Sequence, residues 1–311
     1  MNLISNEVAS QMLEGKKLIV GLSGGIDSVA LLHSVKQLGN CSVRAIHINH
    51  GISGNAAQWV AFCHQVCEEF GIEFTMKQVD VDTTSNVEAN ARKARYEAIK
   101  NEMRHDEYLV TGHHLDDQAE TILLALKRGT GLDGLCGMAP VSTVHGINIC
   151  RPFLGVSREH IEEYATYHDL TWIEDESNTD TSYDRNFLRH EVLPLLNSRW
   201  KGFSQNVART AEMCRSTKEA SNYFTDEHIQ ELTQNGYISN QVLKGKPTSY
   251  QFLVLREWFK KLGIKAQSHA KMKEIQRAII NSRFEALPKL ELQRDTWLVR
   301  TKNKIEIKFP R

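Results

Sequence analysis

The stretch KLIVGLSGGIDSVALLHSV, residues 17–35, decides the fold that we expect for this chain. Its apolar run Leu18–Val20 predicts a buried strand, and the residues after Asp27 have the apolar spacing of a helix. The loop between them carries Gly24 and Gly25, which let backbone N–H groups approach an anion without interference from a Cβ atom. The helix N-terminus that follows adds a favourable dipole for phosphate. The stretch therefore predicts a phosphate-binding loop at the end of a strand.

This loop differs from the P-loop of nucleotide-binding proteins. It lacks the Gly-Lys-Ser/Thr ending, so no lysine reaches the β- and γ-phosphates. Asp27 stands there instead, and an acid beside bound phosphates is best explained as a ligand of Mg²⁺. The alternative is an ordinary strand-to-helix turn in which Asp27 only caps the helix. The serines at both ends of the loop, Ser23 and Ser28, favour the phosphate site.

Length and composition exclude several classes of protein. The 311 residues suggest two domains with ample core. No apolar stretch approaches the roughly 20 residues that span a bilayer, and the N-terminal segment 1–7 has neither the basic start nor the apolar core of a secretory signal. The six cysteines are scattered, as is typical of reduced thiols. We therefore expect a cytoplasmic protein without a membrane partner.

A net charge of zero conceals a division of charge along the chain. Residues 1–200 carry 17 Lys and Arg against 27 Asp and Glu, a net charge of −10. Residues 201–311 carry 21 Lys and Arg against 11 Asp and Glu, a net charge of +10. A basic half of this size predicts contact with nucleic acid. The alternative is a lysine-rich surface that is merely solvated.

The alternation of apolar patterns predicts a doubly wound α/β fold. Short β-type runs alternate with helical patterns through the first ~180 residues, which is typical of a mostly parallel sheet with helices on both faces. The expected strands are 17–22, 43–49, 73–79, 108–111 and 147–151, and the expected helices are 26–38, 55–70, 88–104, 116–127 and 157–168. Ligands of such a sheet bind beyond the carboxyl ends of the strands, where the phosphate loop lies.

The pattern changes near residue 200, where the charge also changes sign. Helices are expected at 204–235, 249–262 and 269–282, followed by short strands at 289–293, 297–301 and 305–309 that form a hairpin or meander. We therefore expect a catalytic domain over residues 1–205 and a smaller, basic, mainly helical domain over residues 206–311.

A second polar cluster, TGHHLDDQAET at residues 111–121, begins where an expected strand ends. Asp117 and Glu120 are three residues apart and so lie on one helical face. Two acids and two histidines at a strand end could bind Mg²⁺, capture an amine or transfer protons. The alternative is an Asp N-cap with Glu120 in a capping box, which explains one acid and leaves the other polar groups unexplained.

Three further segments carry candidate ligand-binding residues. Arg92, Arg95 and Tyr96 share a helix surface, where arginine can clamp phosphate and tyrosine can stack on a base. Arg185 and Arg189 are four apart and so face one side of a helix. The histidines at the end of the second strand could line the same crevice, and the glycine-rich loop after residue 127 suits a mobile lid. Arginines that are only solvated are the alternative.

Together these segments resemble the N-type ATP pyrophosphatases and, within them, the tRNA(Ile)-lysidine synthetase family. The resemblance is dense from about residue 17 to residue 200 and weaker to residue 311. Its motifs are SGGIDS at 23–28, HxxHG at 47–51, the stretch 88–96, HxDDQxET at 114–121, RGTGL at 128–132, RPFL at 151–154 and DESN at 175–178 with RNxxR at 185–189.

The resemblance implies a two-step reaction on the anticodon of an isoleucine tRNA. ATP would adenylate the C2 oxygen of the wobble cytidine and release pyrophosphate. The amine of free L-lysine would then attack C2 and expel AMP. It implies ATP and Mg²⁺ as cofactors, a tRNA with a CAU anticodon as partner, and a homodimer as one arrangement of the chain.

It also implies roles for residues of this sequence. Asp27 and Asp117 are the expected catalytic residues, with Asp27 holding Mg²⁺. ATP binding is expected at Ser23, Gly24, Gly25, Ile26, Asp27, Ser28, His50, Arg95 and Gly112. Lysine binding is expected at Asp117, Glu120, Arg185 and Arg189, and tRNA binding at Arg128, Lys271, Lys273 and Arg277.

Three other functions use the same loop. A tRNA thiolation enzyme would replace lysine with sulfur, but members of that group often carry a cysteine pair, and Cys136 is the one cysteine here within a candidate loop. A small-molecule amide synthetase would not need the basic half. An ATP-sensing RNA-binding module would bind nucleotide without releasing pyrophosphate.

Overall fold

The chain forms two compact units in a computed structural model, which describes residues 2–51, 54–80, 87–233, 235–283 and 285–309. The units are Met1–Arg215 and Ser216–Arg311. The division falls ten residues after the expected boundary at residue 205, and both positions lie within the continuous helix α10 (Phe203–Thr233). The roles of the two units as catalytic and tRNA-binding domains stay predictions.

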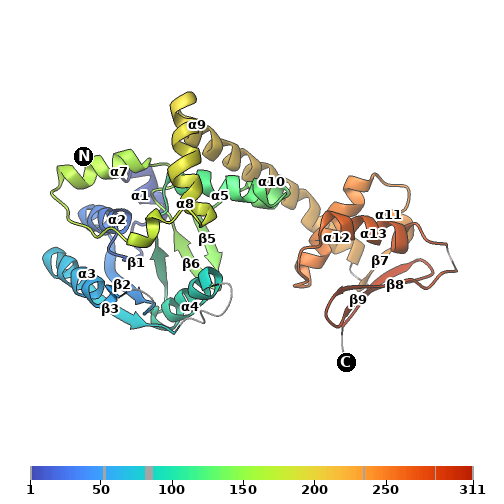
Figure 1. The fold of residues 1–311 in the computed structure, drawn as a ribbon. Helices are drawn as coiled ribbons and strands as arrows, with labels where there is room; N and C mark the ends of the chain where they lie inside the picture. Colours follow the sequence, from blue (N-terminus) through green and yellow to red (C-terminus); the bar gives the residue numbers. More distant parts are fainter. Residues whose placement is uncertain (1, 52–53, 81–86, 234, 284, 310–311) are drawn as a thin grey trace. The chain divides into compact units, whose positions relative to one another are not determined.

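The first unit is built on a six-stranded sheet, which confirms the expected doubly wound α/β fold (Figure 1). The strand order is β3-β2-β1-β4-β6-β5, and all neighbours are parallel except the edge strand β5. The strands are β1 (Lys17–Gly21), β2 (Ser42–Asn49), β3 (Glu73–Gln78), β4 (Glu107–Val110), β5 (Val141–Val144) and β6 (Ile147–Cys150).

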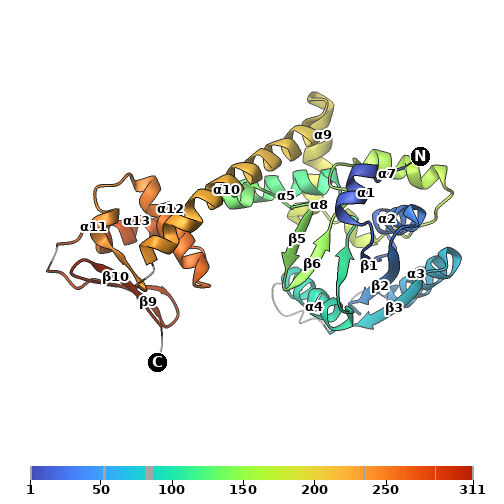
Figure 2. The same cartoon turned by 180° about the vertical axis from the view of Figure 1, so that it is seen from behind.

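Helices cover both faces of this sheet (Figures 1 and 2). One face packs against α1, α2, α3 and α7, and the other face packs against α4. The helices of this unit are α1 (Asn6–Met12), α2 (Ile26–Leu38), α3 (Ala56–Phe70), α4 (Val87–Glu102), α5 (Leu115–Lys127), α6 (Leu132–Leu135) and α7 (Arg158–Tyr167). Then follow a short turn η1 (Glu176–Thr179), α8 (Asp184–Phe187), a π-helical turn η2 (Leu188–Val192) and α9 (Leu193–Arg199).

The central strand β1 explains the apolar run in the sequence. Leu18 and Val20 pack into the core under α2, whereas Ile19 between them packs into the core under α4. A parallel strand with helices on both faces is buried on both sides and therefore reads as a continuous apolar run.

The strand order places two loops side by side. The chain runs from β1 to β2 and β3 on one side and returns to β4 and β6 on the other, so the order reverses between β1 and β4. The loops that leave the carboxyl ends of these two strands therefore meet at the switch point, where ligands of such sheets bind. These are the phosphate loop and the segment that starts the second polar cluster.

The second unit contains an antiparallel sheet of order β7-β10-β9-β8. Strands β8, β9 and β10 form the expected meander, and the short strand β7 adds to its edge. Its core includes Trp258 and Phe259, and Arg300 is buried with N–H bonds to the carbonyls of Ile280 and Ser282. The elements are β7 (Tyr237–Ser239), α11 (Asn240–Leu243), α12 (Thr248–Lys261), α13 (His269–Ile275), η3 (Gln276–Ile280), β8 (Lys289–Gln293), β9 (Thr296–Thr301) and β10 (Lys304–Lys308).

Helices of the membrane-spanning kind are missing from the residues that the structure describes. None of these helices combines the length and the apolar character that a membrane crossing requires.

A buried ion pair joins the two strands that flank β1 at the edge opposite the phosphate loop. The Nε and Nη2 of Arg44 in β2 donate to the two carboxylate oxygens of Glu107 in β4, each at 2.7 Å. The backbone N–H of Arg104 also donates to Glu107, at 2.6 Å. Burial alone would raise the pKa of Glu107, but these hydrogen bonds outweigh it and hold the pKa below its usual value.

We predict that Glu107→Ala lowers the free energy of unfolding by about 3–5 kcal/mol, because the buried charge of Arg44 loses its carboxylate partner and keeps only neutral ones such as the carbonyl of Glu102. Urea unfolding followed by tryptophan fluorescence measures this change. The control is Glu97→Ala, which removes an exposed pair with Lys93 and should cost about 0–1 kcal/mol. Equal effects of the two substitutions would contradict the prediction.

Candidate functional site

Hydrogen bonds made by its two serines fix the conformation of the phosphate loop. The backbone N–H of Ser23 donates to Ser28 Oγ at 3.1 Å, and Ser28 Oγ donates to the carbonyl of Gly25 at 2.9 Å. Gly24 has a φ of +91°, which a residue with a side chain rarely adopts. Gly25 is the N-cap of α2 and has no side chain to cover the free N–H groups of the first turn. The loop thus presents a helix N-terminus suited to an anion.

The floor of the loop is packed and apolar. A Cβ atom on Gly24 would lie 3.3 Å from the sulfur of Cys63 in α3, and the N–H of Ile173 donates to the carbonyl of Gly24 at 2.9 Å. His47 lies under the loop with its Nδ1 2.9 Å from the carbonyl of Leu22, so it has a structural partner. Burial raises the pKa of Cys63 to about 12, so this thiol stays protonated.

Asp27 is paired with an arginine that the sequence analysis did not single out. Both carboxylate oxygens of Asp27 accept from Arg158 Nη1, at 2.9 and 2.8 Å. Burial raises the pKa of Asp27, and the charges of His114 and Arg158 oppose that rise. The backbone N–H of Arg158 also donates to Asp116 at 3.1 Å, so α7 connects both polar segments. No spacing or motif in the sequence marks Arg158, because only the fold brings α7 to α2.

Gly112 is the point at which the two loops touch. A Cβ atom at this position would lie 2.9 Å from the carbonyl oxygen of Asp27 and 3.2 Å from its Cβ. Real Cβ atoms essentially never come this close to backbone, so a larger residue would push the loops apart. Glycine therefore lets the end of β4 contact the first turn of α2.

His114 connects the acids of the two loops. It is the N-cap of α5, and its Nδ1 accepts the N–H of Asp116 at 3.3 Å. Because Nδ1 accepts, Nε2 is the ring nitrogen that carries the N–H, and it lies 3.8 Å from Asp27 Oδ1 and 3.4 Å from Asp117 Oδ2. Asp117 also completes the capping box by accepting the N–H of His114. A capping box is therefore present, but its N-cap is His114 and not an aspartate, and its acid is Asp117 and not Glu120 as the alternative had it.

Asp117 and Glu120 form a closed network with Arg185 and Arg189, so the structure brings together all four residues expected to bind lysine. Asp117 Oδ1 accepts from Nη2 of both arginines, at 3.1 and 3.0 Å. Glu120 Oε2 accepts from Arg185 Nε at 2.6 Å, and Glu120 Oε1 accepts from Arg189 Nε at 2.7 Å. Two negative and two positive charges balance one another.

Within this network, both acids already have charged partners in the absence of a substrate. Glu120 is fully buried, and both of its oxygens already have an arginine partner. Burial would raise the pKa of Asp117, but the charges of His114 and Arg185 outweigh it and lower that pKa. Both acids therefore have cationic partners within the chain before any substrate arrives.

At the end of β2, His50 and Arg95 form a further polar pair. Arg95 donates to His50 Nε2 at 3.2 and 3.3 Å. Burial, together with the charge of Arg95, lowers the pKa of His50 to about 4. The neutral ring then carries its proton on Nδ1, which is buried and has no hydrogen-bond partner within the described residues. An unpaired buried donor of this kind suits a polar group of a ligand. Tyr96, which the sequence placed beside Arg95, is instead buried in the core.

The residues expected to bind tRNA fall in both units. Arg128 is the exposed C-cap of α5 in the first unit. Lys271 in α13 pairs with Glu274 at 3.1 Å, whereas Lys273 and Arg277 are exposed.

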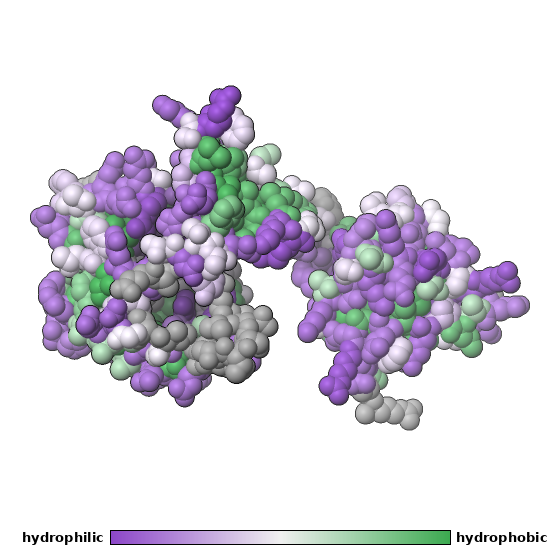
Figure 3. All heavy atoms as spheres, in the orientation of Figure 1, coloured by the Kyte–Doolittle hydropathy of each residue, from purple (hydrophilic) through white to green (hydrophobic). Residues whose placement is uncertain are grey.

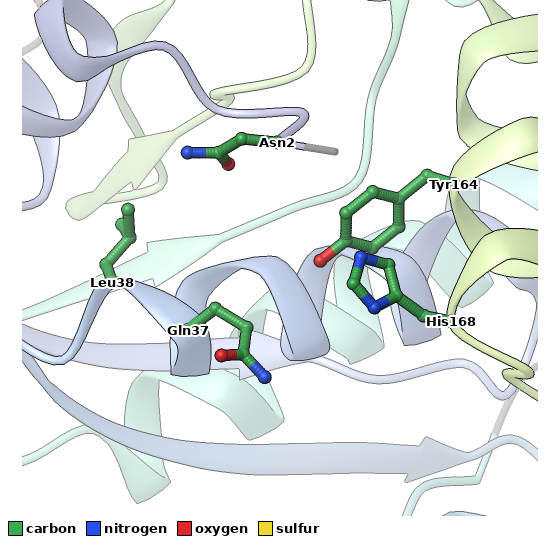
Figure 4. Close-up of a pocket in the computed structure, with 5 residues that line it drawn as sticks. All are labelled: Asn2, Gln37, Leu38, Tyr164 and His168. Atoms are coloured by element: carbon green, nitrogen blue, oxygen red, sulfur yellow. The ribbon is translucent and has the colours of Figure 1, made fainter.

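A separate hollow lies at the other end of α2 (Figure 4). Its volume is about 250 Å³, and the rings of Tyr164 and His168 on its wall have centroids 4.4 Å apart and are tilted by 50° to each other. It is lined by Asn2, Gln37, Leu38, Tyr164 and His168. None of these belongs to the predicted site, so this hollow is not the place of the chemistry described above.

Comparison with a solved structure supports the fold. The chain is similar to the U34-tRNA thiolase NcsA from Methanococcus maripaludis, which holds a [4Fe-4S] cluster. The TM-score is 0.54 and the identity is 20%, and the match covers 68% of this chain and 74% of that one. At this level of identity the likeness concerns the fold alone.

Comparison with known sequences shows the family. Residues 2–196 match the PP-loop domain family. The chain is 44% identical over 290 residues to the tRNA(Ile)-lysidine synthase of Actinobacillus pleuropneumoniae serotype 3 (strain JL03), covering 92% of this chain and 68% of the relative. It is 42% identical over 290 residues to that of Legionella pneumophila (strain Lens), covering 92% and 67%. The chain therefore belongs to the tRNA(Ile)-lysidine synthase family, tRNA-modifying enzymes with an ATP-binding PP-loop domain.

Proposed function

We propose that this chain joins free L-lysine to C2 of the wobble cytidine in the CAU anticodon of an isoleucine tRNA. One observation carries the proposal. A single imidazole, that of His114, lies between Asp27 on the phosphate loop and Asp117 in the network with the arginines. The proposed ATP site and the proposed lysine site therefore share one wall. The names of the curated relatives support the same reaction.

In the first step, the C2 oxygen of cytidine attacks the α-phosphorus of ATP and pyrophosphate leaves. The C2 oxygen is a poor leaving group until it carries the adenylyl group. We assign the binding of pyrophosphate to the loop, through the first N–H groups of α2. The loop residues are Ser23, Gly24, Gly25, Ile26 and Ser28, and the remainder of ATP would contact His50, Arg95 and Gly112.

The residues present fit a Mg²⁺ ion that is shared with ATP. Mg²⁺ in nucleotide sites takes one or two carboxylates and completes its shell with phosphate oxygens and water. Asp27 supplies one carboxylate beside the loop. The described residues hold no cluster of three or more metal-binding side chains, so ATP would supply the other ligands. When bound, the ion neutralises charge on the departing pyrophosphate. Asp27 would exchange its contact with Arg158 for the ion.

In the second step, the lysine amine attacks C2 and AMP leaves with the oxygen. Free lysine brings a carboxylate and two amino groups, of which the ε-amine is the one that attacks, and these groups match in sign the arginines and the acids of the network. We assign the carboxylate of lysine or the α-phosphate to Arg185 and Arg189, and the ammonium to Asp117 and Glu120. The incoming charges would replace partners within the network, so no charge is left unpaired. Asp117 is assigned as the acceptor of the amine proton.

The tRNA would be held by basic residues in both units. Its phosphates would contact Arg128 in the first unit and Lys271, Lys273 and Arg277 in the second. Affinity for tRNA is expected to fall as the salt concentration rises, because bound counterions are released. The homodimer and the cytoplasmic location stay predictions.

The direct test supplies the protein with ATP, Mg²⁺, tRNA and labelled lysine, and analyses the nucleosides of the product by mass spectrometry. We predict that Asp27→Asn lowers lysidine formation by about 10²–10³-fold. The Mg²⁺ ion would lose its carboxylate ligand, and the charge on the departing pyrophosphate would no longer be balanced. Asp106→Asn makes the same change at an exposed position and should leave the rate unchanged. Normal turnover of Asp27→Asn would overturn the assignment, and a wild-type protein that incorporates no label would overturn the function.

Gly112→Ala tests the contact between the two loops. Its Cβ would meet the backbone of Asp27 at 2.9 Å, so the phosphate loop must shift. Overpacking of this kind costs about 1–3 kcal/mol, and we expect weaker ATP binding by roughly tenfold, measured by calorimetry. Gly155→Ala is the matched control, because its Cβ would meet nothing within 4 Å. Unchanged ATP affinity of Gly112→Ala would show that this contact does not determine the position of the phosphate loop.

Thiolation of tRNA is the second candidate function, and the cysteines argue against it. Cys136 is buried and its thiol donates to the carbonyl of Leu132 at 3.1 Å. Burial raises the pKa of Cys63 and Cys67 to about 12, so neither is a ready nucleophile. We therefore predict that Cys136→Ser keeps the wild-type rate of lysidine formation by mass spectrometry. A large loss of rate, or a thiolated base in the product, would favour thiolation.

A further inference from the structure

The phosphate loop contains no positively charged side chain. Residues 21–28 include neither lysine nor arginine, so the donors that the loop offers to an anion are backbone N–H groups and serine hydroxyls. A helix N-terminus is equivalent to roughly half an elementary charge, which is small against the several negative charges of a triphosphate. Within the described part of the chain, Asp27 is the loop residue that has ion pairs, with Arg158 and His114. A cation for the phosphates must therefore come from outside the loop.

Arg158, the first residue of α7, places its guanidinium beside the loop. Its Nη1 donates to both carboxylate oxygens of Asp27, at 2.9 and 2.8 Å. Asp27 is the second residue of α2, so the guanidinium lies beside the helix end whose first N–H groups have no partner within the helix. An anion that binds to those N–H groups would therefore lie within reach of Arg158.

The guanidinium of Arg158 keeps one nitrogen free. Nη1 pairs with Asp27, and Nε donates to Glu162 at 2.8 Å. Nη2 has no hydrogen-bond partner among the described residues, and 39% of the side chain is exposed. Figure 3 shows a largely hydrophilic surface over the region of α7. Arginine N–H groups match phosphate oxygens in geometry and in charge, so Nη2 suits an oxygen of ATP.

The buried pair of Arg44 and Glu107 shows how a purely structural arginine differs. All three nitrogens of the Arg44 guanidinium have acceptors, and its side chain is only 5% exposed. Such an arginine has no donor left for a ligand. Arg158 is accessible and has an unused donor. Its pair with Asp27 therefore holds the side chain in place without filling its hydrogen-bonding capacity.

The backbone around Arg158 is fixed, so only the side chain has to turn toward a ligand. The N–H of Arg158 donates to Asp116 Oδ2 at 3.1 Å, and the N–H of Leu115 donates to the carbonyl of Val156 at 2.9 Å. These bonds tie the start of α7 to the start of α5. Rotation about the side-chain bonds can then exchange Asp27 for a phosphate while α7 stays where it is.

We propose that Arg158 binds the β- and γ-phosphates of ATP and stays with the pyrophosphate that they become. This inference rests on the proposed function, in which ATP is split beside the loop. When Asp27 contacts Mg²⁺, Arg158 loses its carboxylate partner and takes phosphate oxygens instead. As the bond between the α-phosphorus and the bridging oxygen breaks, that oxygen keeps the electron pair, and Arg158 contacts the group that gains this charge. Helix α7 thus supplies the cation that a lysine of the loop supplies in P-loop proteins.

The test measures binding of inorganic pyrophosphate, ATP and AMP by calorimetry in EDTA, without tRNA or lysine. Loss of a hydrogen bond between charged groups corresponds to roughly 10–100-fold in affinity, so Arg158→Met should weaken pyrophosphate and ATP binding by this factor. AMP lacks both leaving phosphates and should bind as it does to the wild type. Arg158→Lys keeps the charge and should lose less affinity than Arg158→Met. The matched control is Arg104→Met, which removes an exposed arginine from its pair with Glu73 and should change none of these affinities.

A second background separates direct contact from the masking of a charge. Removal of Arg158 also bares the carboxylate of Asp27, which would repel pyrophosphate by itself. In Asp27→Asn that charge is absent. A further Arg158→Met substitution should still weaken pyrophosphate binding by roughly tenfold in this background, because the guanidinium touches the phosphates. An unchanged affinity there would show that Arg158 only neutralises Asp27, and would overturn the proposal.

Two other results would also contradict it. The first is wild-type affinity of Arg158→Met for pyrophosphate. The second is an equal loss of affinity for AMP, which would indicate a distorted site and not a lost phosphate contact. Because binding is measured without tRNA, lysine or turnover, failure to form lysidine would overturn the proposed function and leave this result standing. Thermal unfolding of each variant verifies that it is folded.

Discussion

The contact between Gly112 and the backbone of Asp27 is the constraint on which the site depends. It joins the carboxyl end of β4 to the first turn of α2, and a Cβ atom there would lie 2.9 Å from the Asp27 carbonyl. Because β1 and β4 are neighbours at the switch point of the sheet, the phosphate loop and the HxDDQxET segment start from adjacent strand ends. His114 can then stand within 4 Å of an acid from each segment.

Charge balance is the second organising feature of the site. Asp27 is paired with Arg158, and Asp117 and Glu120 are paired with Arg185 and Arg189. Carboxylates in such buried positions would otherwise be protonated or would destabilise the fold. In the proposed reaction, lysine and a Mg²⁺ ion with phosphates would exchange with these partners without leaving an isolated charge.

The parts of the fold that depend on local pattern were predictable. The apolar run at Leu18–Val20 gave the central strand, since a strand that is covered on both faces has no polar side to show. The edge strand β5 was missed, because its alternating and half-exposed residues lack such a run. Tyr96 was placed on a surface by helical spacing and is buried, because spacing fixes which residues share a face and not what covers that face.

The sequence by itself determined the phosphate loop, the family resemblance and the two acids at the start of α5, because these depend on residue types at short fixed spacings. Only the tertiary structure decided which partners those residues have. Arg158 meets Asp27 across 131 positions of sequence, and Arg189 meets Asp117 across 72. No local pattern encodes such pairings, since they follow from the order of strands in the sheet and from the packing of α7 and α8 against its carboxyl edge.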